Sequence, residues 1–528
     1  NALHPRMTPV TTVNSRLTLT LPPLKAVILQ GKDAGTKRAG VLLHPTSLPA
    51  ACGNGVLGPA AYRFVDFLKA AGQRVWQILP LTPPLMGDSP YLSESAFAGN
   101  EALISLEVLR DWGWLKQEAL DDFLAQGKKT ASWHSLAAYK AKLLWDMSHD
   151  PDLTIPWEPF RAFCEKNAYW LDDYALFRAV RDFFGGRCWT EWPEDIRHHS
   201  QAALAQYGKE LAGAVSHVKF MQYIFSRQWH DVRAYAAENG VSILGDVPMF
   251  VAHNSADCWA HQDQFDLDEA GNPSSVAGVP PDYFSADGQL WGNPLYDYQA
   301  MARDNYQWWT DRFRRMMDLV DEVRVDHFRG FAAYWAVPSG SETAKSGAWK
   351  EGPGLDLFRA VYQKIGRLRL VAEDLGVITD DVCTLKDALH LPGMKVIQFH
   401  LKDRADGRLA FDTEPDCIAY TGTHDNNTIR GWYEDDLTPS QQLHVRQMLK
   451  LPDEAAPQEI VGALIAYTYC RRAETVIIPM QDLLALPSSG RMNTPGVADG
   501  NWHWQLKEGQ TTFDIAHWLA KACRESGR

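Results

Sequence analysis

The sequence predicts an α/β fold in which eight parallel strands, each followed by helical segments, close into a (β/α)8 TIM barrel. Short apolar runs rich in Val, Ile and Leu recur along the chain, as expected for strands buried on both faces. Amphipathic stretches of helical length, such as residues 355–367 and 459–472, separate the later runs. Acidic residues end several runs, where barrels of this kind carry their functional groups.

Eight apolar runs supply the expected strands, and each is closed by polar residues, proline or glycine. They span Gly40–His44, Val75–Leu79, Val241–Asp246, Val323–Asp326, Leu368–Glu373, Lys395–Leu401, Cys417–Thr421 and Thr475–Met480. A doubly wound open sheet is the alternative arrangement of the same elements. The number of runs favours the barrel.

The rest of the chain sets the expected domain organisation. Residues 1–38, rich in Thr and Pro, form an N-terminal extension or leader that we expect to be poorly ordered. Residues 39–528 form the barrel, with two insertions on its carboxyl face. One is a mostly helical subdomain at about 100–235, and the other is an irregular loop region at about 254–298, rich in Asp, Gly, Pro and aromatics. No C-terminal β-sandwich domain is expected.

Composition excludes several functional classes. The net charge of −13 opposes binding to nucleic acid or to anionic lipid through bulk charge, and a neutral substrate fits it better. No run of about 18 apolar residues is present, so no membrane span is expected. The motifs of zinc proteases, phosphate-binding loops and dinucleotide-binding folds are missing from the sequence, so we expect no metal and no cofactor.

The eight cysteines are scattered and include no C-x-x-C pair. In a chain of this length they are typical of reduced thiols and not of a disulfide framework or a zinc site. We therefore expect a cytoplasmic protein, or one of the plastid stroma if the N-terminal extension is a transit-peptide remnant.

Three acidic residues stand at expected strand ends: Asp326 in Val-Arg-Val-Asp-His-Phe-Arg-Gly, Glu373 in Ala-Glu-Asp-Leu-Gly, and Asp425 in Thr-His-Asp-Asn. Retaining chemistry on a glycosidic bond needs one carboxylate as nucleophile and another as acid/base. A third can stabilise the positive charge that develops on the sugar ring. Each residue alone is explained by a helix N-cap or an ion pair. The three in this order favour chemistry on a glycosidic bond.

The neighbours of these acids support distinct roles. Strand alternation places Arg324 and Asp326 on one face, where the guanidinium keeps the carboxylate ionised, as a nucleophile requires. The apolar neighbours of Glu373 raise its pKa, as a general acid requires. His424 and Asp425 lie in one tight turn and are expected to hydrogen-bond sugar hydroxyls.

Three further residues have two interpretations each. Asp246 either orients the other acids or caps a turn before Pro248. Tyr91 is either a platform for a sugar ring or a core residue. For His44, packing against a loop is favoured over a place in the site.

These motifs resemble the 4-α-glucanotransferases, also called amylomaltases or disproportionating enzymes, of glycoside hydrolase family 77 in the α-amylase clan. The resemblance extends from about Arg38 to the C-terminus. Besides the acidic signatures it is carried by Gly40-Val-Leu-Leu-His-Pro-Thr-Ser-Leu-Pro, Ser89-Pro-Tyr, Ser95-Ala-Phe-Ala-Gly-Asn, Gly245-Asp-Val-Pro, Val279-Pro-Pro-Asp-Tyr-Phe-Ser, Trp291-Gly-Asn-Pro-Leu-Tyr and Arg491-Met-Asn-Thr-Pro-Gly.

One departure from the wider clan favours the transferase branch. Many α-amylase-type hydrolases carry Asn-His shortly after the acidic residue of the third strand, whereas this chain has Met249-Phe250. The resemblance implies that α-1,4-glucans and maltooligosaccharides act as both donor and acceptor. An α-1,4-glucan hydrolase on the same barrel is the nearest alternative. A non-catalytic glucan-binding protein is a further one, and the three intact acids speak against it.

The resemblance also implies the role of each site residue. Asp326 is expected to be the nucleophile, Glu373 the acid/base, and Asp425 the residue that stabilises the transition state. Others are expected to bind substrate: Arg324, His327, His424 and Asp246 around the sugar, Tyr91 beneath it, Asn493 in a lining loop, and Tyr283, Phe284 and Trp291 in a loop that holds the acceptor and restricts water. The oligomeric state is not predicted.

Overall fold

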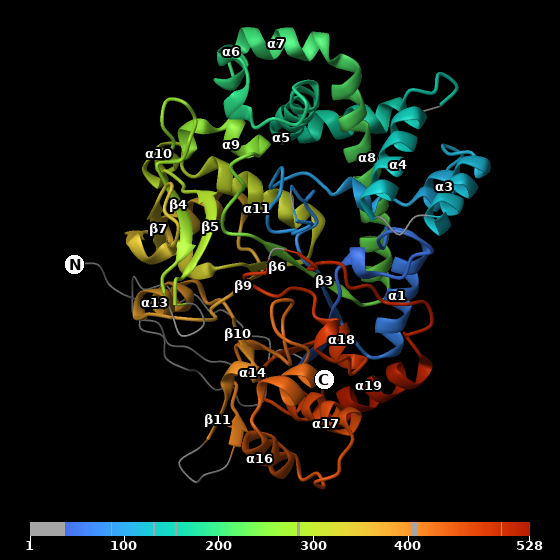
Figure 1. Ribbon diagram of the computed structural model, residues 1–528, viewed down its shortest axis with the longest axis vertical. Helices are drawn as coiled ribbons and strands as arrows, with labels where there is room; N and C mark the ends of the chain where they lie inside the picture. Colours follow the sequence, from blue (N-terminus) through green and yellow to red (C-terminus); the bar gives the residue numbers. More distant parts are fainter. Residues whose placement is uncertain are drawn as a thin grey trace, which may run out of the picture. The chain divides into compact units, whose positions relative to one another are not determined.

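The computed structural model describes residues 37–85, 87–129, 133–153, 156–281, 286–403, 409–497 and 499–528 (Figure 1). Most of the expected N-terminal extension, residues 1–36, lies outside them, as do Tyr283 and Phe284. None of the described helices combines the length and apolar character needed to cross a membrane.

Eight parallel strands form a barrel, so the open-sheet alternative is excluded. The strands are β1 (Arg38–Leu42), β2 (Val75–Gln77), β3 (Ser242–Val247), β6 (Glu322–Val325), β9 (Leu370–Ala372), β10 (Gly393–Val396), β13 (Cys417–Tyr420) and β14 (Thr475–Pro479). Parallel pairing joins all neighbours in this order except β9 and β10, and β14 returns to pair with β1. Between β9 and β10 the Ala372 N–H donates to the Pro392 carbonyl at 2.9 Å, which completes the ring.

Successive side chains of the barrel strands point alternately into the barrel and out toward the helices, so the core has an inner and an outer layer. One apolar cluster joins side chains from seven barrel strands, including Leu42, Val75, Leu244 and Ile477, and fills the barrel interior. Their strand neighbours, such as Val41 and Trp76, belong to the larger cluster that packs against the surrounding helices. A strand with apolar residues at both alternations is therefore buried on both faces.

The sixth run departs from its expected form. Residues 395–401 were expected to be a strand, but the strand β10 ends at Val396 and a helical turn, α14 (Ile397–His400), follows. An apolar run does not by itself distinguish a strand from a buried helical turn. Here the turn places Gln398, whose side-chain amide donates to the carbonyls of Thr421 and Asn427 at 3.0 and 2.9 Å.

The described residues between β2 and β3 form helices and no strand. Their α-helices are α2 (Leu106–Asp111), α3 (Gln117–Lys129), α4 (Trp133–Ser148), α5 (Trp157–Phe183), α6 (Glu194–Arg197), α7 (Gln201–Glu210) and α8 (Ala212–Glu238). The long helices α5 and α8 pack on each other through aromatic pairs such as Phe163–Tyr223, with ring centroids 5.6 Å apart. Figure 1 shows these helices gathered at one side of the barrel.

The segment 254–298, expected to be an irregular loop region, contains regular structure. It holds α9 (Ala256–Ala260) and two strands, β4 (Ser275–Val279) and β5 (Gln289–Pro294). These join β7 (Ala333–Pro338) and β8 (Ala348–Glu351) in an antiparallel sheet of order β5-β4-β7-β8. The pairing of β4 with β7 is long-range, and local turn residues do not reveal it. Trp291 accordingly lies on a strand, β5.

Further helices follow the strands. They are α1 (Pro59–Ala70), α10 (Tyr298–Arg303), α11 (Gln307–Leu319), α12 (Gly354–Ile365), α13 (Asp380–Leu389), α15 (Ile429–Gly431), α16 (Pro439–Leu449), α17 (Pro457–Tyr469), α18 (Met480–Leu483) and α19 (Phe513–Ser526). Two short strands, β11 (Leu401–Asp403) and β12 (Leu409–Phe411), form a separate pair. The described residues after β14 contain no strand, and the eight cysteines form no disulfide.

Gly40 offers a test of the barrel packing. A Cβ on Gly40 would lie 2.6 Å from the Val75 carbonyl oxygen, which cannot move without breaking the pairing of β1 and β2. We expect Gly40→Ala to reduce the free energy of unfolding by roughly 1–3 kcal/mol, the usual range for overpacking. Urea unfolding measures it.

Gly208→Ala is the matched control. Gly208 lies on α7 with no atom within 4 Å of the added carbon, so this change should stabilise the helix by about 0.5–1 kcal/mol. Equal unfolding curves for Gly40→Ala and the wild type would contradict the tight packing described here.

Candidate active site

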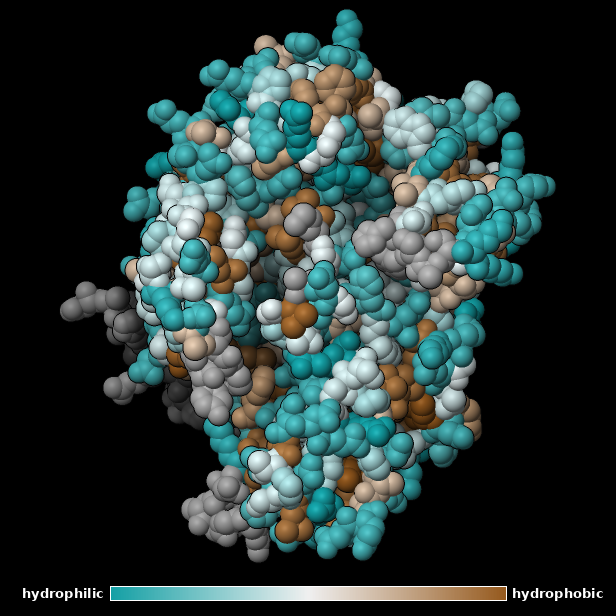
Figure 2. All heavy atoms as spheres, in the orientation of Figure 1, coloured by the Kyte–Doolittle hydropathy of each residue, from teal (hydrophilic) through white to brown (hydrophobic). Residues whose placement is uncertain are grey.

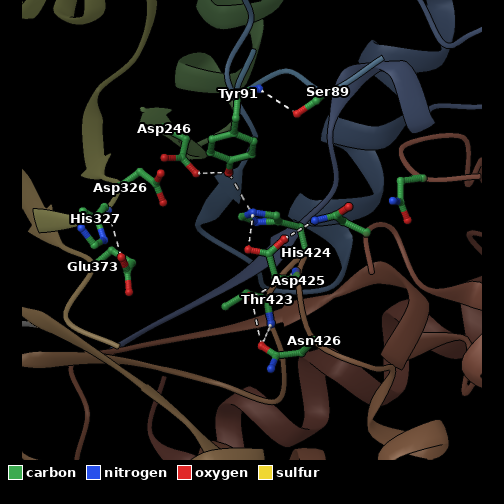
Figure 3. Close-up of polar contacts among 12 residues, drawn as sticks. Ser89, Tyr91, Asp246, Asp326, His327, Glu373, Thr423, His424, Asp425 and Asn426 are labelled. Carbon is green, nitrogen blue, oxygen red and sulfur yellow. Dashed lines mark hydrogen bonds and ion pairs between the residues drawn. The ribbon is translucent and has the colours of Figure 1, made fainter. Parts of the chain in front are cut away.

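The carboxyl ends of four barrel strands bring the predicted acidic residues together. Asp246 is the penultimate residue of β3, Asp326 follows β6, Glu373 follows β9, and Asp425 lies in the turn after β13. Figure 3 shows Asp326 and Glu373 on one side of a common space, with Asp425 across from them. The three acids that the sequence places far apart therefore surround one site.

Arg324 lies at the centre of this arrangement. Its Nη1 donates to both carboxylate oxygens of Asp246 at 2.7 Å, and its Nη2 lies 2.9 Å from Oδ1 of Asp326. Only 5% of the Arg324 side chain is exposed. Burial lowers the pKa of Arg324, but the charges of Asp246 and Asp326 outweigh this and hold it well above its ordinary value. The guanidinium thus fixes the Asp326 carboxylate in place.

Glu373 is held by backbone donors. Its Oε2 accepts from the N–H of His327 at 2.9 Å, and its Oε1 accepts from the N–H of Leu375 at 2.8 Å. Burial raises the pKa of Glu373 to about 7, although the charge of Arg324 acts in the opposite direction and that of Asp326 adds to it. Near neutral pH this carboxyl group can therefore both give and take a proton.

His327 provides the link between Asp326 and Glu373. Its backbone adopts the left-handed conformation, with φ 45° and ψ 50°, which turns its N–H toward Glu373 directly after the strand ends. Burial lowers the pKa of His327 to about 4, so the ring is neutral at pH 7. The ring meets the edge of Trp291 at a centroid distance of 4.8 Å, and its Nε2 has no hydrogen-bond partner among the described residues.

Asp425 is anchored from two sides. Its Oδ1 accepts from Nδ2 of Asn493 at 2.6 Å, and its Oδ2 lies 3.3 Å from Nε2 of His424. Burial by itself raises the pKa of Asp425, but the charge and hydrogen bond of His424 and the Asn493 amide lower it to about 2. Burial lowers the pKa of His424, yet Asp425 raises it above its ordinary value overall. Asp425 is therefore firmly anionic.

Tyr91 joins the two halves of the site. Its hydroxyl donates to Oδ2 of Asp246 at 2.7 Å, and its ring stacks on His424 with centroids 5.0 Å apart. The Ser89 hydroxyl accepts from the Tyr91 N–H at 3.3 Å, which fixes the Ser-Pro-Tyr turn (Figure 3). Tyr91 is thus a residue of the site and not of a remote core.

His44 is buried near the site without touching its acids. It lines a small cavity beneath His424 together with Asn426 and Asp482. Burial lowers the pKa of His44 to about 3, so the ring is neutral. The Asp482 carboxylate accepts from the Thr421 hydroxyl at 2.6 Å and from the Ile429 N–H at 2.7 Å, which ties α18 to the turn that carries Asp425.

Two residues near the site were not predicted from the sequence. Arg491 donates through Nη2 to the Asp425 carbonyl at 2.9 Å and through Nε to the Asn493 carbonyl at 3.3 Å. Arg491 begins the motif that contains Asn493, so its place in that motif is a signal by which it could have been found. Trp502 lies 5.9 Å from the rings of both Tyr91 and His424, and no sequence pattern marks it.

Metal ligands are not grouped in the described part of the chain. It contains no cluster of three or more His, Cys, Asp or Glu residues that could hold an ion.

Replacing Arg324 tests the central ion pairs. Arg324→Met leaves the fully buried Asp246 carboxylate without its cation, so we expect a loss of roughly 3–5 kcal/mol in unfolding free energy, measured by urea unfolding. Arg359→Met is the control, because Arg359 pairs with Asp356 on the exposed face of α12 and should change stability little. A loss no larger than the control's would contradict the role of Arg324.

Comparison with known proteins identifies the family. The family model for 4-α-glucanotransferases, glycoside hydrolase family 77, matches residues 43–511. The chain is 43% identical to the chloroplastic/amyloplastic 4-α-glucanotransferase of Solanum tuberosum, over 93% of this chain and 85% of the relative. It is also 43% identical to the 4-α-glucanotransferase of Thermus thermophilus, over 89% of this chain and 95% of the relative.

A solved structure agrees with the sequence relatives. The amylomaltase from Streptococcus agalactiae in complex with acarbose superimposes with a TM-score of 0.86 at 34% identity, covering 93% of this chain and 99% of that one. The resemblance inferred from the motifs is confirmed, and so is the barrel fold. The chain belongs to the 4-α-glucanotransferases of glycoside hydrolase family 77.

Proposed function

We propose that this chain transfers α-1,4-glucan segments from a donor to the 4-hydroxyl of an acceptor glucan or glucose by a retaining double displacement. One observation carries the mechanism. Strands β6 and β9 are adjacent and hydrogen-bonded, and each is followed by an acidic residue. Asp326, after β6, pairs with the guanidinium of Arg324, whereas Glu373, after β9, has a pKa of about 7. Retaining chemistry requires this difference between its two acids.

In the first half-reaction Asp326 attacks the anomeric carbon of the donor. The new bond joins that carbon to a carboxylate oxygen as the glycosidic bond breaks, and Glu373 gives its proton to the departing 4-oxygen. The covalent intermediate has the inverted, β configuration. Arg324 pairs with Asp326 at 2.9 Å and holds it in place, so it acts as a positioning residue for the nucleophile.

In the second half-reaction an acceptor 4-hydroxyl replaces the leaving group. Glu373, now a carboxylate, takes the hydroxyl proton while the acceptor oxygen attacks the anomeric carbon and the bond to Asp326 breaks. The second inversion restores the α configuration. One residue acts first as acid and then as base because its pKa lies near the working pH.

The remaining residues bind the sugar and stabilise its charge. Asp425, firmly anionic, faces the positive charge that develops on the ring in the transition state. His424, Asn493 and Asp246 offer hydrogen-bonding groups around it, and the Tyr91 ring supplies a surface for stacking. His327 and Arg324 complete this set of contacts.

Transfer prevails over hydrolysis only where the acceptor is held and water is kept away from the intermediate. Trp291 supports this role, because it is half-buried on β5 and contacts His327 beside both catalytic acids. Tyr283 and Phe284 belong to the same proposal on the strength of the family resemblance alone. The relatives named above are transferases, which favours this reading over the hydrolase alternative.

A reducing compartment, cytoplasmic or plastid-stromal, suits a chain whose eight cysteines form no disulfide.

Incubation with maltotriose tests the function. Transfer should yield glucose together with maltopentaose and longer oligomers, because a maltosyl unit passes from one molecule to another. Chromatography of the products at early times measures this. Maltose and glucose as the sole products would establish hydrolysis and defeat the proposal.

Variants of the two acids test the mechanism. Glu373→Gln should slow turnover of maltotriose at least ~10²-fold, because proton transfer is lost. With α-maltosyl fluoride, whose leaving group needs no proton, it should still accumulate a covalent sugar on Asp326, detected by intact-protein mass. Asp326→Asn should form no such adduct. An adduct in Asp326→Asn, or none in Glu373→Gln, would refute the assigned roles.

The pH profile follows from the pKa of Glu373. The free enzyme must carry the proton on Glu373 to start the reaction, and this form is depleted as pH rises through about 7. We therefore expect kcat/KM for maltotriose to fall about tenfold per pH unit above this value. Initial rates between pH 5 and 9 measure it, and a flat profile up to pH 9 would exclude Glu373 as the acid.

A further inference from the structure

A second cavity, of about 330 Å³, lies apart from the active site. Its walls come from residues 49–63, which follow β1, and from helices α2, α3 and α4. None of its lining residues belongs to the site described above. Its volume is in the range of small-molecule pockets.

The walls of this cavity are mainly apolar. Leu106, Phe123, Leu136 and Val56 line it from different elements. Helix α3 packs closely against its floor, since a Cβ on Gly127 would lie 2.3 Å from Cβ of Cys52. The cavity therefore has a fixed apolar wall on which a hydrophobic ligand can pack.

Lys140 is the exceptional residue of the lining. It is 93% buried on α4, and its ammonium donates to one carbonyl, that of Ala102, at 2.8 Å. The side-chain amide of Asn54 also donates to this carbonyl, at 3.0 Å, so the carbonyl keeps a hydrogen bond without the lysine. No carboxylate of the described residues lies within ion-pair distance of Lys140.

The charged and titratable neighbours do not neutralise this group. Glu508, at the cavity edge, pairs with Arg63 at 3.3 Å, and Glu107 lines another part of the wall. Burial lowers the pKa of Lys140 to about 7, and only Cys52 acts in the opposite direction. An ammonium in an apolar wall without a counter-ion is costly, and an arriving anion would remove that cost.

We propose that this cavity binds a small amphiphilic anion, whose carboxylate pairs with the Lys140 ammonium and whose apolar body packs on Phe123 and Leu136. A neutral ligand, a sugar included, would leave the ammonium uncompensated. This inference is independent of the proposed function, because it uses no residue of the active site.

Binding of such an anion is coupled to protonation. At pH 8 most Lys140 amines are neutral. Binding of one anion should therefore be accompanied by the uptake of close to one proton from the buffer by the Lys140 amine. The affinity should therefore fall as pH rises above about 7. Arg63, Glu107, Glu508 and Cys52 are the other groups that line the cavity and titrate or carry charge, and none of the acids contacts Lys140.

Titration calorimetry with octanoate and with octan-1-ol, its uncharged counterpart, tests the proposal. Octanoate should bind the wild-type protein once per chain and at least tenfold more tightly than the alcohol. The observed binding enthalpy at pH 8 should differ between phosphate and Tris buffers. The difference should equal the difference in ionisation enthalpy of the two buffers for close to one proton. Absence of saturable octanoate binding, or equal affinity for acid and alcohol, would overturn the proposal.

Variants locate the binding. Lys140→Met should remove both the preference for octanoate and the proton uptake. Lys142→Met is the matched control, since Lys142 lies on the same helix but is exposed and pairs with Asp146. Ala137→Phe, at the exposed edge of the cavity, should block octanoate while leaving Lys140 in place. Maltotriose transfer should be unchanged in all three variants, which verifies that they fold. If Lys140→Met and Ala137→Phe both left the affinity for octanoate unchanged, the proposed site would be refuted.

Discussion

The ion pairs of one buried guanidinium, Arg324, determine how this active site is organised. Arg324 joins Asp246 on β3 to Asp326 after β6, and its charge acts on Glu373 after β9. One buried cation thus pairs with the carboxylates at two neighbouring strand ends and acts through its charge on the carboxyl group at a third. Asp326 contacts this cation directly, whereas Glu373 accepts hydrogen bonds from backbone N–H groups and burial raises its pKa to about 7.

Much of this arrangement could be predicted from the sequence. Each expected strand corresponds to a barrel strand, because buried parallel strands are apolar at both alternations and end in polar residues. The strand-end positions of Asp246, Asp326 and Glu373 followed from the same pattern. Hydrophilic side chains cover most of the face shown in Figure 2, which agrees with the burial of the apolar strands and helix faces in the core.

Other features were not predictable because long-range contacts decide them. The helical turn α14 replaces strand where Gln398 reaches two carbonyls on a later segment. Strand β4 forms against β7, which follows Asp326 in the chain. Trp502 approaches Tyr91 from more than four hundred residues away. Local pattern carries no information on such pairings.

The pairing of the first barrel strand with the last has a consequence for biosynthesis. Arg38 lies beside Thr475 in register, so β1 has no partner on that edge until β14, more than four hundred residues later, has left the ribosome. The exposed edge is then a template for wrong pairing for the whole period of translation. Contacts of such long sequence separation also form slowly. A nascent chain of this enzyme therefore depends on protection of β1 until β14 arrives.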